Sequence, residues 1–273
     1  MLYIRTLLFW SLFLPSLEAF ALAAWEIRQT EVSIDKTSKK KVETLKIITI
    51  AANRYRLDTT PVDEDSDKEV KQLVIFDGES ILVCTTGKDS QKGTCFRGTP
   101  ESLLSFSNSI TQGVVETDVK QMQVKALGKS KKVLGKKCDM FAVRQDIESS
   151  MSVGVSIKSS LKTKEKLCAA SESSGILQPF KNFKFDVKAM KSIYKNDDHL
   201  KAAIKYGKLG VVLESTQFIS TNMGGELAKM VGQKGGSEMT KTIKTKSIKK
   251  INVKDSIFQL PKDFTVTDLK SKE

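Results

Sequence analysis

The sequence has little of the side-chain chemistry that most catalytic and metal sites require. Among 273 residues there is one histidine, His199, and the four cysteines include no C-x-x-C pair. Ser-His-Asp or Cys-His catalysis would depend on His199 alone, which stands beside two aspartates in a predicted exposed helix. Structural zinc sites need clustered cysteine and histidine ligands, so the same scarcity disfavours zinc. We expect a non-enzymatic protein without a metal or cofactor.

One acidic run resembles a calcium loop but lacks its essential residues. Asp63, Asp65 and Asp67 alternate as the first ligands of such a loop would. Lys68 stands where the turn glycine is needed, and Val74 stands where a bidentate glutamate is needed. A solvated acidic loop is the better interpretation.

Positive charge is in excess, with 45 basic against 32 acidic residues and a formal net charge of +13. Such a balance favours anionic partners, and a solvated lysine-rich surface is the simpler alternative. The predicted strand Glu238–Val253 carries much of this charge, and we expect it to be an exposed edge strand protected by its lysines. It lacks interleaved aromatic residues, so nucleic acid is not an expected partner.

Residues 1–23 have the three parts of a secretory signal. Arg5 lies in a short first region, an apolar run extends over residues 7–17, and small residues follow at Ala21 and Ala23. The run is shorter than the roughly 20 residues that span a bilayer, so we expect cleavage, after Ala21 or after about Ala23, rather than a retained anchor. The expected product is one periplasmic or secreted domain over residues 24–273, acting as a monomer.

All four cysteines lie in the part that would be exported, which favours disulfides. Three pairings are possible. We predict Cys84 with Cys95, because they bracket a symmetric hairpin-like loop. We predict Cys138 with Cys168, because they bracket a second possible hairpin near Val153.

Apolar periodicity predicts strands along most of the chain and helices in one region. From Ile176 to Tyr194, apolar residues that include Phe180, Phe183 and Met190 recur at helical spacing. Asp197 can cap a second helix through Ile204. The apolar stripe is either ordinary core or the lining of a lid over an apolar cavity.

The central stretch Asn53–Val83 contains an arginine-bearing strand and a predicted hairpin at Asp77-Gly78. The runs YRLDTTP and LVIFDGESILV resemble the outer-membrane lipoprotein carrier superfamily, the Lol-type periplasmic chaperones. Tyr55-Arg56, Pro61 and Asp77-Gly78 match the motif positions of that family, and residues 258–266 resemble its closing strand. The run VLGKKCDMFAV is more similar to uncharacterised exported bacterial proteins thought to share the fold.

The resemblance implies an α+β fold: a strongly curved antiparallel sheet, an open half-barrel, with helices packed on its concave face. It also implies that Arg56 holds a helical lid closed, whereas the sequence alone equally allows a surface pair with Asp58. On this basis we expect an apolar or acylated ligand, a lipid or lipoprotein, near Arg56, Phe180, Phe183 and Met190. The alternative is an envelope interaction or sensor protein that contacts a protein or an anionic membrane surface through its lysine-rich face.

Overall fold

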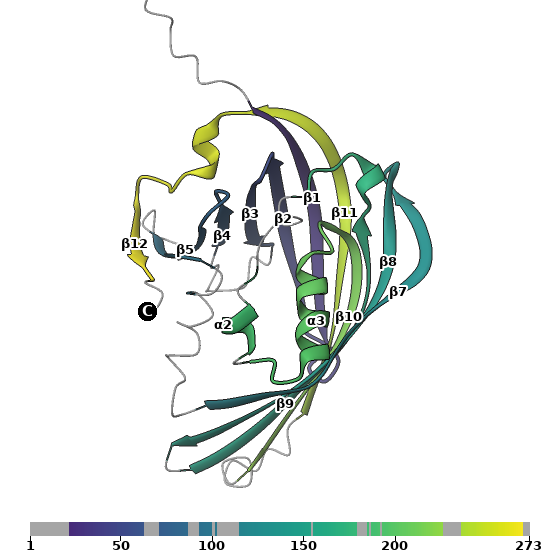
Figure 1. Ribbon diagram of the computed structural model, residues 1–273, viewed down its shortest axis with the longest axis vertical. Helices are drawn as coiled ribbons and strands as arrows, with labels where there is room; N and C mark the ends of the chain where they lie inside the picture. The colour runs from purple at the N-terminus through teal and green to yellow at the C-terminus, as the bar shows by residue number, and fades with distance from the viewer. Residues whose placement is uncertain are drawn as a thin grey trace, which may run out of the picture.

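Twelve strands form one curved, open sheet in the computed structural model (Figure 1). The structure describes residues 22–62, 71–86, 93–99, 102, 115–153, 155–178, 185, 187–191, 193–225 and 236–269. In chain order the strands are β1 (Leu22–Asp35), β2 (Lys41–Ala51), β3 (Arg54–Pro61), β4 (Lys71–Phe76), β5 (Ile81–Thr86), β6 (Gly93–Gly98), β7 (Val115–Val133), β8 (Lys136–Val153), β9 (Val155–Ala170), β10 (Val212–Gly225), β11 (Gly236–Val253) and β12 (Phe264–Asp268).

The sheet order is β12-β6-β5-β4-β3-β2-β1-β11-β10-β9-β8-β7. Every neighbouring pair is antiparallel except β12 with β6, which is parallel. Two helices are described, α2 (Val187–Lys191) and α3 (Asp197–Gly207), together with the short 3-10 turns η1 (Glu172–Ser174) and η2 (Asp255–Phe258). In Figure 1 the sheet bends around α3, so we call the face toward α3 the inner face and the opposite one the outer face.

The expected α+β class is wrong, because the described chain is almost entirely sheet and α3 is the one helix of more than five residues in it. The apolar spacing after Ile176 misled the prediction. Gly175 takes a left-handed φ of 71°, and Ile176 and Leu177 continue without helical structure. Gln178 precedes Pro179, and the residue before a proline disfavours the helical region. Within the described residues, only Val187–Lys191 of the predicted first helix is helical.

The two ends of the sheet bury opposite faces. On the inner face, Leu200 and Ala203 of α3 pack with Val143 of β8 and Leu167 of β9. Near the other edge, the segment after β11 covers the outer face, where Phe258 of η2 packs with apolar residues of β4, β5 and β6. A third apolar cluster, which includes Ile27 of β1 and Leu213 of β10, lies between these two.

Two further predictions need correction. Strand β11 lies between β1 and β10, so it is not an edge strand, and most of its lysines reach solvent from the sheet surface instead. The cap of α3 is Asn196 rather than Asp197. The Asn196 side chain accepts hydrogen bonds from the backbone N–H groups of Asp198 and His199. Both aspartates instead occupy the first helical turn, where negative charge favours the helix dipole.

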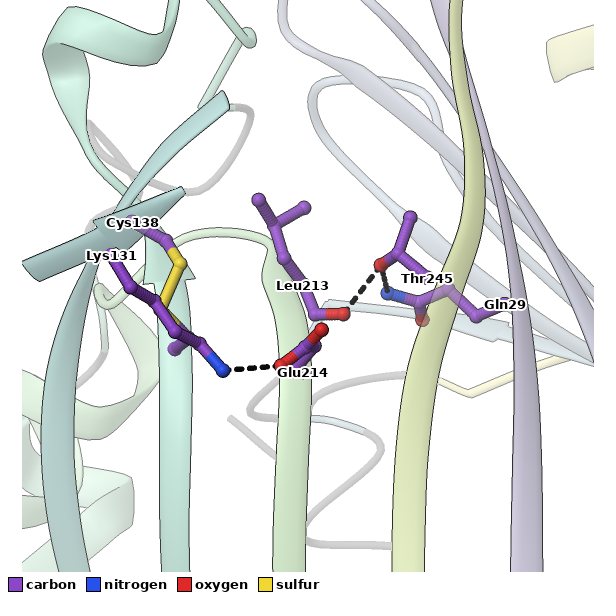
Figure 2. A network of polar contacts seen from close by, with 7 residues as sticks. Gln29, Lys131, Cys138, Leu213, Glu214 and Thr245 are labelled. Carbon is purple, nitrogen blue, oxygen red and sulfur yellow. Dashed lines mark hydrogen bonds and ion pairs between the residues drawn. A yellow bond between two sulfur atoms is a disulfide. The ribbon is translucent and has the colours of Figure 1, made fainter. Parts of the chain in front are cut away.

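Irregularities in the sheet are stabilised by side chains of the inner face. The register shifts in β1 after Arg28 and in β10 after Val212. Gln29 donates hydrogen bonds to the carbonyl of Val212 at 2.6 Å and to Oγ1 of Thr245 at 3.1 Å. Thr245 in turn donates to the carbonyl of Leu213 (Figure 2). These bonds satisfy carbonyl groups where the strand ladder is disturbed.

Candidate functional site

Both predicted disulfides are present, and the described residues include no free cysteine. Cys84 lies directly opposite Cys95 across β5 and β6. Cys138 joins Cys168 across β8 and β9. Two disulfides are compatible with an extracellular or periplasmic location.

Arg56 is tied into the protein by its neighbours. Its guanidinium pairs with the carboxylate of Asp58 at 2.8 and 2.7 Å and donates to the carbonyl of Ile257 at 2.8 Å. Both contacts lie on the outer face, where the segment after β11 crosses the sheet. Since α3 lies on the inner face, the described contacts of Arg56 do not include that helix. The pairing with Asp58, which the sequence also allowed, is present. Residues 179–184 of the predicted lid lie outside the described residues, so the lid contact of Arg56 stays a prediction.

Of the other three predicted ligand residues, the structure describes one. Met190 of α2 is buried in the cluster that joins α2 and α3 to the inner face, so its described contacts are with core. Phe180 and Phe183 lie outside the described residues.

A charged cluster that sequence analysis missed lies on the inner face. Glu31 of β1 is contacted by Lys46 of β2 and by Lys241 of β11, the latter at 3.0 Å. Burial opposes ionisation of Glu31, but the hydrogen bonds and charges of the two lysines outweigh it and lower the pKa of that carboxyl. The three side chains therefore link three adjacent strands. Alternation along β1 could have shown that Glu31 shares a face with Ile27 and Gln29.

Glu165 of β9 is a second buried carboxyl on the same face. It accepts a hydrogen bond from the hydroxyl of Tyr206 on α3 at 3.1 Å. Burial raises the pKa of Glu165, and hydrogen bonds from Tyr206 and Ser215 and the charge of Lys241 only partly offset it. Burial, with the adjacent Glu165, raises the pKa of Tyr206 as well. This contact fixes the end of α3 to the sheet.

His199 has a described contact with the backbone of the sheet. Its Nδ1 lies 3.1 Å from the carbonyl oxygen of Val119, at the contact between α3 and β7. No group of three or more histidine, cysteine or carboxylate side chains in the described chain could hold a metal ion. Among the same residues, no helix has both the length and the apolarity to span a bilayer.

A row of cations lies on the outer face of the sheet, in the half whose inner face is covered by α3. Residues of β9 alternate between buried and exposed, so Lys164 and Lys166 face outward on either side of buried Glu165. Lys164 lies directly opposite Arg144 of β8, and Lys166 shares its row with Lys125 of β7. We call the following exposed residues the outer basic patch: Lys125, Arg144, Lys164, Lys166 and Lys244.

Carboxylates near the outer basic patch are already engaged by other lysines. Asp146 pairs with Lys162 at 3.4 Å, and Glu214 pairs with Lys131 (Figure 2). Within the described chain, no ion pair is found for any residue of the patch. The patch therefore has no direct ion-pair partner among the described residues, although Glu214 stands opposite Lys244 in the strand register.

An aromatic side chain and a shallow groove accompany the patch. Phe218 of β10 lies opposite Lys164 and is 49% exposed. The ammonium group of Lys36 lies 5.9 Å from the centre of its ring. Beside Lys244, an open groove of about 350 Å³ runs over β2, β1 and β11. The outer face thus combines cations with an exposed apolar ring.

No family model and no curated protein matches this chain. Its fold has a faint likeness to a solved structure of PNGF-II, with 10% sequence identity and a TM-score of 0.40. That match covers 90% of this chain and 31% of the other, so this chain spans about a third of that protein. A likeness of this strength indicates nothing about function. The resemblance to the lipoprotein carriers stays a prediction.

Proposed function

We propose that this chain is a non-enzymatic exported protein that binds anionic lipid surfaces through the outer basic patch. The observation that carries the proposal is the register of Arg144 and Lys164. Like charges directly opposite each other on neighbouring strands destabilise a sheet. The pair does not stabilise the fold, whereas an anionic surface would attract both side chains and offset their mutual repulsion.

The arrangement suits a membrane better than a protein or a polyanion. The patch lies on one continuous sheet face, and exposed Phe218 stands among its cations. Aromatic rings partition into the interfacial region of a bilayer, while lysine and arginine are attracted to its anionic head groups. Each such residue near an anionic surface contributes about 1 kcal/mol of binding free energy.

The test is sedimentation of the protein with lipid vesicles. We expect binding to phosphatidylcholine vesicles that contain about 30% phosphatidylglycerol, weak binding to pure phosphatidylcholine, and loss of binding in high salt. The triple variant R144Q/K164Q/K166Q should bind on the order of 100-fold more weakly, from about 1 kcal/mol per charge. The matched control K71Q/K208Q/K262Q removes three exposed lysines from other elements and should bind like the wild type.

Equal loss in both triple variants would show that net charge rather than the patch matters, and the proposal would fail. Phe218→Ser keeps every charge, so it tests the aromatic contribution separately and should also weaken binding. Binding of DNA or of an acidic protein in place of vesicles would likewise contradict the membrane assignment.

An exported location is consistent with this function. Cleavage after Ala21 would leave β1 whole, whereas cleavage after Ala23 would remove Leu22 and Ala23, the first two residues of that strand. We therefore propose that cleavage follows Ala21. Sequencing the N-terminus of the exported protein decides between the two positions.

Binding of an apolar or acylated ligand is a second candidate. The inner face of the β3–β6 half carries partly buried apolar residues in one row, since Leu57, Val74 and Val83 lie opposite one another in register. Such a row offers apolar contact area. Native mass spectrometry of protein purified without detergent would show a bound lipid as added mass, and a clean apo mass would count against this candidate.

A further inference from the structure

A groove of about 560 Å³ lies where the start of β1 meets the end of β11. Trp25 and Ile251 contribute from these strands, and Leu177 contributes from the segment after η1. Its lining residues include no carboxylate, and its one charged lining residue is Lys250. The volume is in the range of small-molecule sites, roughly 300–1,000 Å³. The groove is therefore mainly apolar, with a cation at its side.

Two ammonium groups converge on Trp25. The Nζ of Lys136 lies 4.3 Å from the centre of the indole ring, and the Nζ of Lys250 lies 5.3 Å from it. Lys250 stands opposite Trp25 in the strand register, whereas Lys136 comes from the start of β8. Lys136 also donates to the carbonyl of Ser174 at 3.3 Å. Within the described chain, neither ammonium group has an ion pair.

The arrangement leaves two positive charges around one aromatic ring, beside apolar surface. Cation–π contact with Trp25 stabilises each ammonium group but does not neutralise it. An anionic group that reaches both would gain charge-assisted hydrogen bonds, and an attached alkyl chain would gain the apolar contacts of Trp25 and Leu177.

We propose that this groove binds an anionic amphiphile of the fatty-acid class. Its carboxylate contacts Lys250 and Lys136, and its chain lies against Trp25 and Leu177, which belong to one apolar cluster. A cationic or zwitterionic amphiphile would place like charge against the two ammonium groups or leave one of them unpaired. The chemistry of the site therefore selects a carboxylate head group with a single chain.

This inference goes beyond the lipid-surface function, because the two sites are separate. Lys244, the patch residue nearest to Lys250 along β11, is six residues away from it, which is about 20 Å along an extended strand. The register also places Lys244 on the outer face and Lys250 on the face of Trp25. Variants at one site should therefore leave the other unaffected.

Tryptophan fluorescence tests the proposal directly. The chain has two tryptophans, Trp10 and Trp25. In the full chain carrying Trp10→Phe, Trp25 is the sole tryptophan, so its emission reports on this groove. We expect laurate, added below its micelle concentration, to change the emission saturably with one site per chain. Acetate and dodecanol, which lack the chain and the charge respectively, should bind far more weakly.

Charge removal supplies the second measurement. In the same background, K136Q/K250Q should weaken laurate binding roughly ten- to hundredfold, because two charge-assisted contacts are lost. The control K132Q/K249Q removes two exposed lysines from β7 and β11 and should bind laurate normally. Near-ultraviolet circular dichroism verifies that each variant is folded.

Three outcomes would overturn the proposal: no saturable emission change with laurate, dodecanol binding as tightly as laurate, or unaltered binding by K136Q/K250Q. Vesicle sedimentation of the same variants separates this result from the proposed function. If K136Q/K250Q loses laurate but keeps vesicle binding, both proposals stand; if laurate never binds, only this one fails.

Discussion

The hydroxyl of Tyr206 on α3 donates a hydrogen bond to Oε2 of Glu165 on β9, with 3.1 Å between the two oxygens. This is a polar tether between the helix and a buried carboxyl of the sheet. Because Glu165 is buried, the folded protein holds its proton more tightly than the unfolded chain does. The tether therefore links the stability of the fold to pH.

The sign of this linkage follows from the raised pKa of Glu165. The protonated group stabilises the fold fully below the unfolded pKa of 4.5, and this contribution is lost as pH rises through the folded pKa. Glu165→Gln does not titrate, so its free energy of unfolding relative to wild type should rise as the pH increases from about 4 to about 8. Denaturant titrations at several pH values measure this. Glu148→Gln, at an exposed position, is the control for removing one carboxylate.

Glu31 should show the opposite dependence. Its pKa is lowered in the folded state, so its stabilising contribution is present above pH 4.5 and is lost as pH falls through the folded pKa. Glu31→Gln should lower the free energy of unfolding by about 2 kcal/mol at neutral pH, because hydrogen bonds to Lys46 and Lys241 are weakened. The deficit should shrink in acid. The exposed pair partner Glu43 supplies the control E43Q, and an equal cost there would refute the prediction.

The two disulfides should contribute unequally to stability. Their partners are 11 and 30 residues apart. The chain-entropy model predicts that the free energy of unfolding falls by about 3 kcal/mol in C84A/C95A and by about 4 kcal/mol in C138A/C168A. The second loss is larger because a disulfide that closes a longer loop removes more conformational entropy from the unfolded chain. Urea unfolding of the two double variants checks the order. Peptide mapping without reduction checks the pairing itself, and a Cys84–Cys138 linkage would contradict it.

Gly93 should be needed for docking of the parallel strand β12. A Cβ at this position would lie 2.2 Å from the Phe264 ring, too close for any contact without movement. Gly93→Ala should displace Phe264 and cost about 1–3 kcal/mol of stability, as overpacking does. Hydrogen exchange of the Phe264–Asp268 amides should become faster. Thr94→Ala, at the exposed neighbouring position, should leave that exchange unchanged.

The strands and disulfides could be predicted from local patterns. Alternation of apolar and polar residues indicated most of the strands, the Asp77-Gly78 pair marked the β4–β5 hairpin, and the symmetric spacing of Cys84 and Cys95 predicted their pairing. These features depend on neighbours in sequence or on hairpin partners. For that reason they needed no knowledge of the distant parts of the chain.

Long-range arrangement could not be predicted. The lysines of β11 looked like protection for an edge, but β11 pairs on one side with β1, from the other end of the chain. The apolar spacing after Ile176 looked helical, yet Ile176 and Leu177 pack against the core without forming a helix. Spacing alone does not distinguish a helix from an extended segment that packs on one side.

The sequence by itself determined the sheet-forming segments and the excess of positive charge, and it predicted the pairing of the four cysteines that the structure has. Only the tertiary structure decided where that charge is concentrated. The strand register sets Arg144 opposite Lys164, and the fold brings Lys136 to the ring of Trp25. The residues next to each of these in the sequence do not indicate either arrangement. The physical reason is that register and sheet order depend on the packing of faces from distant strands, which no single segment specifies.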